Sequence, residues 1–346
     1  IPEVAARSHI EMILPVIDNA LRDFWQNFHA DKLQNDWRGQ VWSEIDAVAC
    51  TVMPGLIGSL LVGSLTARTL ALAHRKPFYA IHHVEAHAYA NFITDMVRYN
   101  HPHEVTFDKI RESQPKFPIL ALLVSGGHSQ IVLFRDHGNY ELLGQTADDA
   151  VGEAFDKVAK ILGLPYPGGP SIARVALGGN SRKYDFPKAR MARKYDFSFS
   201  GVKTAVLRLV QQEVGVDHTF PSGKLSERLS AAQVTDFAAS FQRVAVETLV
   251  DKLILAYREF APKSVIIAGG VSANQALRRE IRQRFAVEDP SLKIEFPPLY
   301  LCTDNAMMIG ALAYFKAKRT LAEDPLTVEV IHSVSVQKTA VYIVVM

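Results

Sequence analysis

The chain has 346 residues, of which 48% are hydrophobic, and its 38 lysines and arginines against 36 aspartates and glutamates give a formal net charge of only +2. This length and apolar content predict a large core, divided between two domains or lobes. The small charge excludes a globally basic nucleic-acid binder, so any nucleic-acid contact must be a local patch or be shared with a partner.

The sequence also bears on the compartment. Cys50 and Cys302 lie far apart in sequence and make no disulfide framework, which predicts a reducing, cytoplasmic environment. No run of about 18 apolar residues occurs, so no membrane span is expected, and no signal peptide is visible. The chain begins at Ile1, directly in a predicted helix, which we interpret as a truncated start.

The first third of the chain alternates helices and short strands. Apolar residues recur at helical spacing from residue 3 to residue 28, and later apolar runs are short and bounded by Pro and Gly. Helices are predicted over residues 3–28, 59–73 and 82–92, and strands over residues 45–51 and 77–81. This alternation predicts an α/β lobe. Residues 94–118 are polar and are interpreted as the connection between lobes.

The remaining sequence predicts a second unit of the same style. Three strands in series suggest a meander, and a later apolar strand is preceded and followed by helical patterns. The predicted strands are residues 119–124, 130–134, 140–143 and 264–268, and a Pro/Gly turn is predicted at 165–169. The predicted helices are 150–162, 274–284 and 305–317, and residues 230–260 form either one long helix or two. The predicted divisions are a first lobe (1–117), a second lobe (118–303), a returning helix (304–320) and an atypical tail (321–346). A duplicated actin-like fold with a nucleotide in its cleft and a doubly wound sheet are the two architectures considered.

Two histidines suggest a metal site. His83 and His87 are four residues apart, so on a helix they share a face and can bind one ion. Ordinary helix residues near a lobe interface are the commoner explanation for this spacing. A zinc protease requires Glu directly after the first His, and Val84 occupies that position. Asp304 precedes a predicted helix and is either a third ligand or an N-cap. Two imidazoles and a carboxylate would suit iron(II) or zinc.

Two diglycine turns suggest a nucleotide site. Gly126-Gly127 and Gly269-Gly270 each follow a buried strand, where glycines let the backbone approach a phosphate. A tight turn without a ligand is the alternative for each. Asp156 and Gly168-Gly169 could contact the ribose or the base, and otherwise are a helix charge and a turn.

Basic residues form two groups that could bind a polyanion, although a solvated surface is the commoner explanation. The first group is Arg182, Lys183, Lys188, Arg190, Arg193 and Lys194, with Tyr184 and Tyr195 interleaved, and the second is Arg278, Arg279, Arg282 and Arg284.

With these residues in view, the chain resembles the TsaD family of tRNA threonylcarbamoyltransferases, once described as O-sialoglycoprotein endopeptidases, and its bacterial branch in particular. The similarity runs in family order from Ile1 to about Leu321. The matching stretches are His82-His83-Val84-Glu85-Ala86-His87-Ala88, Leu122-Leu123-Val124-Ser125-Gly126-Gly127-His128, residues 148–157, Tyr166-Pro167-Gly168-Gly169-Pro170, residues 196–201, Gly269-Gly270-Val271-Ser272-Ala273-Asn274 and Leu301-Cys302-Thr303-Asp304-Asn305.

The resemblance implies an actin-like ATPase (ASKHA) fold of two duplicated lobes with a nucleotide cleft. It implies one divalent ion per subunit, iron(II) or zinc, held by His83, His87 and Asp304. It implies a threonylcarbamoyl-AMP site built from Leu123, Val124, Ser125, Gly126, Gly127, Asp156, Gly169 and Asn274.

The implied reaction moves the threonylcarbamoyl group to N6 of the adenosine directly 3′ of the anticodon, in tRNAs reading codons that begin with A, and releases AMP. Because the donor is a mixed anhydride, the enzyme mainly needs to orient the amine and neutralise phosphate charge. No general base is assigned. The implied partners are tRNA, a smaller TsaD-like paralogue (TsaB) and a P-loop ATPase (TsaE), with no membrane.

The ends of the chain depart from the family pattern. The family normally begins with a strand and a Gly-Ile-Glu-Thr-Ser-Cys-Asp turn, which is absent here. The family usually ends with an Arg-Pro-rich tail, whereas residues 327–346 include a hydrophobic run from Val341 to Met346. A damaged or frameshifted end is the hypothesis.

Three other functions are weighed: a small-molecule kinase of the same fold, a non-catalytic paralogue acting as a dimer scaffold, and a protease. Scaffold paralogues lack the His pair and the Asp, and the histidine spacing disfavours the protease.

Overall fold

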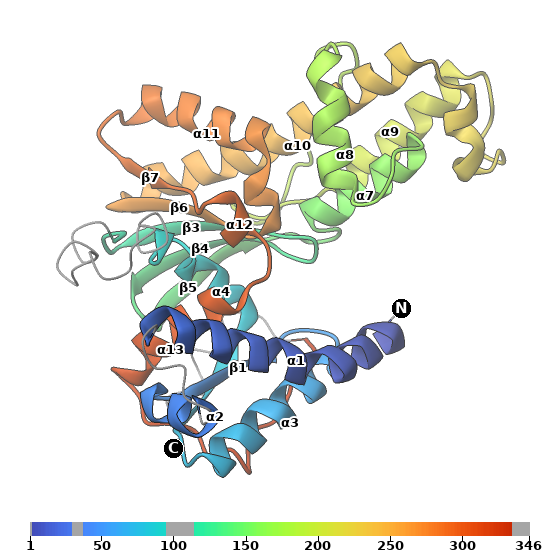
Figure 1. The fold of residues 1–346 in the computed structure, drawn as a ribbon. Coiled ribbons are helices and arrows are strands. Elements are labelled where there is room, and N and C mark those ends of the chain that lie inside the picture. The colour runs from blue at the N-terminus through green and yellow to red at the C-terminus, as the bar shows by residue number, and fades with distance from the viewer. Residues whose placement is uncertain (1, 30–36, 95–113, 334–346) are drawn as a thin grey trace. The chain divides into compact units, whose positions relative to one another are not determined.

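The structure is a computed structural model that describes residues 2–29, 37–94 and 114–333 (Figure 1). It is a mixed α/β chain with two compact units. Unit 1 comprises Ile1–Tyr89 and Ala306–Met346, and unit 2 comprises Ala90–Asn305. Our prediction set divisions at 117/118 and 303/304, and residues 95–113 of the predicted connection lie outside the described residues.

Unit 1 contains a two-stranded parallel sheet with Val48 opposite Phe78. Its strands are β1 (Val48–Met53) and β2 (Phe78–His82), and its helices are α1 (Pro2–Phe28), α2 (Trp37–Val41), the 3₁₀ turn Trp42–Glu44, α3 (Ile57–Ala73), α4 (His83–Tyr89) and α13 (Ala306–Ala317). All five predicted elements of the first third are confirmed, with the helix predicted over 82–92 ending earlier, at Tyr89.

Helix α3 packs against β1 because one of its faces is small. Leu60, Ser64, Ala67 and Ala71 recur at three- and four-residue spacing and are the buried residues of the helix. The alanines of this stripe form a small core with Phe78, which is fully buried. The short side chains of Ser64, Ala67 and Ala71 allow the helix and the sheet to approach closely.

The outer edge of β1 is largely open. Among the described residues, β1 pairs only with β2, apart from the bond that Ile331 N–H donates to the Val52 carbonyl at 2.9 Å. A cavity of about 650 Å³ lies beside this strand within unit 1, lined in part by Ala49, Thr51 and Tyr314.

The described part of the predicted tail is anchored on unit 1. Glu323 N–H donates to the Phe78 carbonyl at 3.0 Å. The Arg68 guanidinium donates to the main-chain carbonyls of Pro325, Leu326 and Val328. Residues 334–346, which include the rest of the predicted atypical end, lie outside the described residues.

Unit 2 is built on a five-stranded sheet with the order β5-β4-β3-β6-β7. Its strands are β3 (Ile119–Val124), β4 (Ser129–Asp136), β5 (Asn139–Gln145), β6 (Ser264–Ala268) and β7 (Lys293–Glu295). The strands β3, β4 and β5 form the predicted antiparallel meander, while β3, β6 and β7 are parallel. Every residue of β3 and β6 is buried, as expected for central strands covered on both faces.

Helices surround this sheet and supply most of the core. They are α7 (Val151–Ile161), α8 (Gly168–Val175), α9 (Ser200–Glu213), α10 (Ala231–Phe260), α11 (Gln275–Glu288) and α12 (Leu299–Cys302), with 3₁₀ turns at Ala176–Gly178, Ser222–Arg228 and Gly270–Ala273. The pattern over 230–260 forms a single helix, which begins at a capping box of Ser230 and Gln233.

Four elements of unit 2 were not predicted: α8, α9, β7 and α12. The predicted turn over 165–169 is wrong at its end, because Gly168 and Gly169 are the first residues of α8. Helix α9 buries Val202, Val206 and Val210 at four-residue spacing, a pattern that was available in the sequence. None of the described helices has the length and apolarity that a membrane crossing requires.

Candidate functional site

The two histidines lie on one short helix of unit 1. Helix α4 follows β2 without a break, and His83 and His87 are one turn apart on it, with ring centroids 4.8 Å apart. His87 is buried and His83 is half-buried. The predicted shared helix face is therefore present.

Asp304 lies close to the two histidines in space, although it is distant from them in sequence. It lies two residues before α13, and α13 packs against α4 within unit 1. One ligand atom from each of His83, His87 and Asp304 can be chosen so that all three lie within 4.8 Å of one another. Two imidazole nitrogens and one carboxylate oxygen form a donor set suited to iron(II) or zinc, with coordination positions left for other ligands.

The turn after β3 is a tight hairpin with an open outer side. Ser125 N–H donates to the His128 carbonyl at 2.8 Å, and His128 N–H donates to Ser125 Oγ at 3.1 Å. Gly126 and Gly127 are exposed, and a Cβ atom on either would meet nothing within 4 Å. The turn therefore closes the hairpin and also leaves room for a ligand against its backbone.

The turn after β6 lies beside it. Because β3 and β6 are parallel, with Leu123 opposite Ala268, both glycine turns are at the carboxyl end of neighbouring strands. Gly269 has φ +89°, and a Cβ there would lie 2.4 Å from the Val124 carbonyl oxygen. Ligands of open α/β sheets bind at carboxyl ends of this kind.

Helix α7 begins directly on the turn after β3. Val151 N–H at its start donates to Ser129 Oγ at 2.9 Å. A Cβ on Gly152 would lie 2.7 Å from the Ser125 carbonyl oxygen, so only glycine permits this approach. The start of a helix carries partial positive charge and free N–H groups, which favours an anionic ligand near this turn.

The other predicted ligand-binding residues of unit 2 have structural contacts of their own. Asn274 caps α11, with its Oδ1 accepting from Ala276 N–H at 2.8 Å and its Nδ2 donating to Gln242 at 3.0 Å. Asp156 accepts the Gly168 N–H at 2.7 Å, which fixes the start of α8 against α7.

Three predicted site residues differ in accessibility. A Cβ on Gly169 would meet nothing within 4 Å, so this backbone is open to a ligand. Leu123 and Val124 are core residues, only 1% and 0% exposed. They anchor the end of β3 from which the turn begins.

Two acidic residues before α7, which were not predicted as site residues, form polar contacts at the start of this helix. Asp148 accepts the Phe199 N–H at 2.8 Å. Asp149 binds Lys157 at 2.7 Å and Lys203 at 3.4 Å. Burial alone would raise the pKa of Asp149, but its hydrogen bond with Lys157 and the charge of Lys203 outweigh burial and hold the pKa below its usual value of 3.8. Adjacent acidic residues at the start of a helix were the available signal.

The second basic group does not form one free surface. Arg278 is buried and donates to the carbonyls of Ser272 and Pro297 at 2.7 and 2.8 Å. The Arg282 guanidinium lies 4.8 Å from the Phe296 ring centroid. Arg284 pairs with Asp251 at 3.1 Å, so in this group only Arg279 and Arg282 are exposed without an ion pair among the described residues.

The fold was compared with solved structures. A full-length HypF in a phosphate- and nucleotide-bound form aligns with a TM-score of 0.52 and 12% identity, and HypF of T. kodakarensis aligns with 0.52 and 11%. The alignments cover 84% and 79% of this chain but only 52% and 41% of those chains, so it spans about half of their length or less. At such identity the likeness concerns the fold alone. It confirms the predicted α/β fold of the actin-like (ASKHA) type, as a fold and without a conclusion on activity.

Sequence comparison gives the family within this class. Residues 1–311 match the TsaD family model, described as tRNA N6-adenosine threonylcarbamoyltransferase. A protein of that name from Thermomicrobium roseum is 43% identical over 331 residues, covering 94% of this chain and 82% of its own. One from Symbiobacterium thermophilum is 42% identical over 315 residues, covering 91% and 79%. The chain belongs to the TsaD family of transferases that modify tRNA.

Proposed function

We propose that the chain transfers the threonylcarbamoyl group from threonylcarbamoyl-AMP to N6 of the adenosine directly 3′ of the anticodon, in tRNAs reading codons that begin with A. The N6 nitrogen attacks the carbamoyl carbon, and a new C–N bond forms. The bond from that carbon to the phosphate oxygen breaks, AMP leaves with the electron pair, and the amine loses a proton. No described residue is assigned as the base.

The observation that carries this proposal is the pair of glycine turns at the carboxyl ends of β3 and β6. Gly126 and Gly127 present open backbone, and α7 begins against the same turn. An adenylate carries a phosphate that backbone N–H groups and a helix start can bind. Asn274 and Gly169, on neighbouring elements, are proposed to contact the nucleoside.

The work left to these residues is orientation and charge neutralisation. The mixed anhydride already has a good leaving group, so fixing the phosphate fixes the carbamoyl carbon for attack. Donors aimed at the phosphate also stabilise the negative charge that grows on AMP as it leaves. The backbone that carries these donors is held in place because Gly152 and Gly269 pack directly against the backbone of β3 and its turn.

We further propose that His83, His87 and Asp304 hold one divalent ion, iron(II) or zinc. Such an ion would supply Lewis-acid stabilisation of negative charge. The support is the donor set and the 4.8 Å limit on its ligand atoms. Equilibrium dialysis against zinc should give one ion per subunit for the wild type and none for His83→Ala. Equal binding by both proteins would remove the metal proposal, whatever the activity.

The proposed partners are tRNA, the smaller paralogue TsaB and the P-loop ATPase TsaE. These partners are extended to this chain from the family, and a cytoplasmic location is proposed with them. Co-purification of the three proteins tests the assembly.

The experiment that tests the reaction is transfer of labelled threonylcarbamoyl from its adenylate to transcribed tRNA, with the partner proteins present. Gly127→Val places a side chain in the open space of the turn after β3, and should reduce transfer at least roughly tenfold by blocking the phosphate. Gly223→Val is the matched control, because Gly223 also meets nothing within 4 Å but lies in the Ser222–Arg228 turn.

Three outcomes separate the competing functions. Transfer by the wild type and the control but not by Gly127→Val supports the transferase. Adenylate binding without transfer moves the assignment to a non-catalytic scaffold. ATP consumption with a small alcohol acceptor, and no transfer to tRNA, moves it to a kinase.

A further inference from the structure

A long irregular segment of unit 2, residues 179–197, connects the turn after α8 to α9, and we call it the strap. It contains no helix or strand, and Phe197 alone forms an isolated bridge, with Thr146. Loops of this length without regular structure are uncommon in compact domains and usually carry a function. The strap holds four Lys or Arg residues more than it holds Asp or Glu, which is more excess charge than the +2 of the whole chain.

Aromatic side chains anchor the strap to α10. Tyr184 stacks on Phe237 with ring centroids 3.8 Å apart, and Tyr195 packs against Phe260 at 6.0 Å. Both tyrosines are buried, with only 6% and 8% of their surface exposed. The tyrosines interleaved in the basic sequence therefore fix the strap and do not offer rings to a ligand.

Side chains of α10 also bind the backbone of the strap. Arg243 Nε donates to the Ser181 carbonyl at 2.7 Å. Ser240 Oγ accepts the Tyr184 N–H at 3.2 Å. Lys252 Nζ donates to the Lys194 carbonyl at 2.6 Å. An irregular segment has no backbone hydrogen bonds of a helix or sheet, and these bonds from α10 take their place. The backbone of the strap is therefore held near both of its ends.

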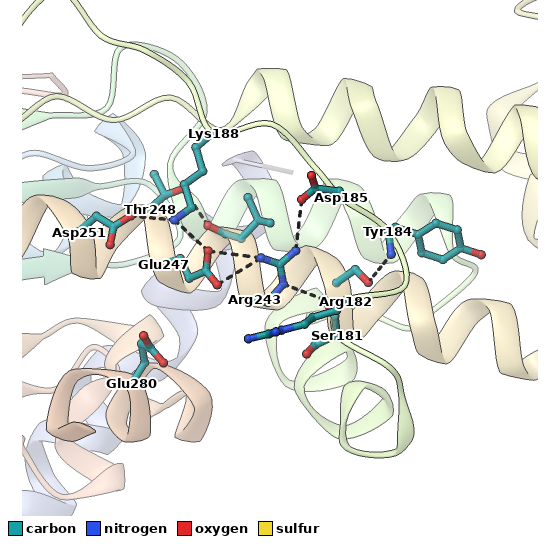
Figure 2. Close-up of polar contacts among 12 residues, drawn as sticks. Ser181, Arg182, Tyr184, Asp185, Lys188, Arg243, Glu247, Thr248, Asp251 and Glu280 are labelled. Atoms are coloured by element: carbon teal, nitrogen blue, oxygen red, sulfur yellow. Dashed lines mark hydrogen bonds and ion pairs between the residues drawn. The ribbon is translucent and has the colours of Figure 1, made fainter. Parts of the chain in front are cut away.

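Two cations of the strap form ion pairs with carboxylates of α10. Figure 2 shows Lys188 between Glu247 and Asp251, with Nζ–O distances of 2.8 and 2.7 Å. Burial would lower the pKa of Lys188, but the two carboxylates outweigh burial and raise the pKa above its usual value. Lys194 pairs with Glu259. The strap thus supplies cations to Glu247, Asp251 and Glu259 of α10, and Arg243 and Arg284 also pair with the first two.

Arg193 pairs with Asp196 of the strap at 3.7 Å, which leaves three of the six strap cations. Arg182, Lys183 and Arg190 are exposed, and no acidic side chain of residues 2–29, 37–94 or 114–333 lies within salt-bridge distance of them. In Figure 2 no ion pair reaches the Arg182 side chain. A rigid backbone thus carries three uncompensated positive charges, while its neighbours Lys188 and Lys194 are already paired.

From this division we infer that Arg182, Lys183 and Arg190 bind the phosphate backbone of tRNA. The inference rests on the proposed function for the identity of the nucleic acid. Phosphates accept from Lys and Arg, and a fixed array of cations binds them at a smaller cost in ordering than a flexible one. Because the strap tyrosines are buried, contact here is to phosphate and not by base stacking, so it orients the tRNA without reading its sequence.

The test is tRNA binding by the full-length protein, followed by fluorescence anisotropy over a salt series. The variant carries Arg182→Gln, Lys183→Gln and Arg190→Gln. A matched control carries Lys160→Gln, Arg208→Gln and Lys224→Gln, which removes the same charge from exposed residues of unit 2 outside the strap. Loss of three phosphate contacts should raise the Kd at least roughly tenfold at 0.1 M salt, and lower the salt slope by about two.

Adenylate binding, measured separately with AMP, shows whether the nucleotide site is intact in each protein. Weakened tRNA binding and a flatter salt slope for the strap variant alone support the inference. Equal losses in variant and control, or no loss in either, overturn it while the transferase proposal stands. A strap variant that binds tRNA normally but no longer binds TsaB or TsaE makes the strap a protein contact and overturns it too. Wild type that binds AMP but no tRNA at any salt overturns the proposed function as well.

Discussion

The turns after β3 and β6 look alike in sequence, since each is a buried strand followed by two glycines, but their glycines serve different purposes. After β6, Gly269 has a backbone conformation available essentially only to glycine, and it presses on the Val124 carbonyl. After β3, Gly126 and Gly127 have no positive φ, and a Cβ on either would meet nothing within 4 Å.

The difference teaches how to separate glycines that the fold requires from glycines that a ligand requires. A glycine whose missing Cβ would strike backbone is explained by packing. A glycine facing open space in a tight turn beside a helix start is not, and ligand access is the remaining physical reason. Gly168 and Gly169 repeat the contrast at the start of α8.

The strongest test of this contrast is Gly269→Ala. The new Cβ would lie 2.4 Å from the Val124 oxygen at φ +89°, so we expect unfolding to become easier by about 3–5 kcal/mol. Gly270→Ala, which meets nothing within 4 Å, is the control. Urea denaturation of both variants measures the difference. Similar stabilities would mean that the turn after β6 relaxes, and the comparison would collapse.

A second, smaller effect is expected at the start of α8. Ala at position 168 would bring its Cβ within 2.6 Å of Asp156 Cα, whereas Ala at position 169 points into open space. Gly168→Ala should cost roughly 2–3 kcal/mol of folding free energy, and Gly169→Ala little. Thermal melts of the pair decide this. An equal drop in both would show that α8 shifts as a whole.

A third, smaller effect concerns only the turn after β3. The charge of Asp149 stabilises the start of α7, which lies against that turn. Its folded pKa is lowered, so its contribution is present above 3.8 and is lost as pH falls through the folded value. Asp149→Asn should therefore cost roughly 0.5–1 kcal/mol at pH 7. Wild type and variant should converge once the pH is below the lowered pKa of Asp149 in the folded protein. A constant gap across the acid titration would contradict the ionic origin of this support.

The smallest effect on folding is expected for Gly126→Ala. With open space around the Cβ, the free energy of unfolding should change by less than about 0.5 kcal/mol. The rise in Tm on adding AMP should nevertheless shrink, because the methyl group occupies space proposed for the phosphate. Calorimetry with and without AMP tests both statements. An unchanged rise in Tm would return Gly126 to the role of a plain hairpin residue.

Much of the fold could be predicted from the sequence because its central elements have strong patterns. β3 and β6 are short apolar runs ended by glycine, and α10 has a capping box and a long apolar stripe. By contrast, α12 is four residues long and β7 only three, too short for any periodicity to be recognised.

The site was predictable as a set of residue types but not as a set of contacts. The spacing of His83 and His87 correctly predicted a shared helix face. No local pattern could indicate that Asp156 binds the Gly168 N–H, or that Tyr184 is buried against Phe237, because each contact joins two different elements. Contacts of this kind are decided by how elements pack, and the paired and unpaired cations of the strap could be told apart only in three dimensions.

The open edge of β1 has a consequence for the order in which the protein unfolds. A two-stranded sheet is marginal by itself. Among the described residues β1 pairs with β2 alone, apart from the single bond from Ile331, whereas β3 is hydrogen-bonded to a strand on both sides. Amides of β1 should therefore exchange with deuterium through openings that leave β3 and β6 protected. Unit 1 would then open as a separate cooperative unit, well before the chain as a whole is lost.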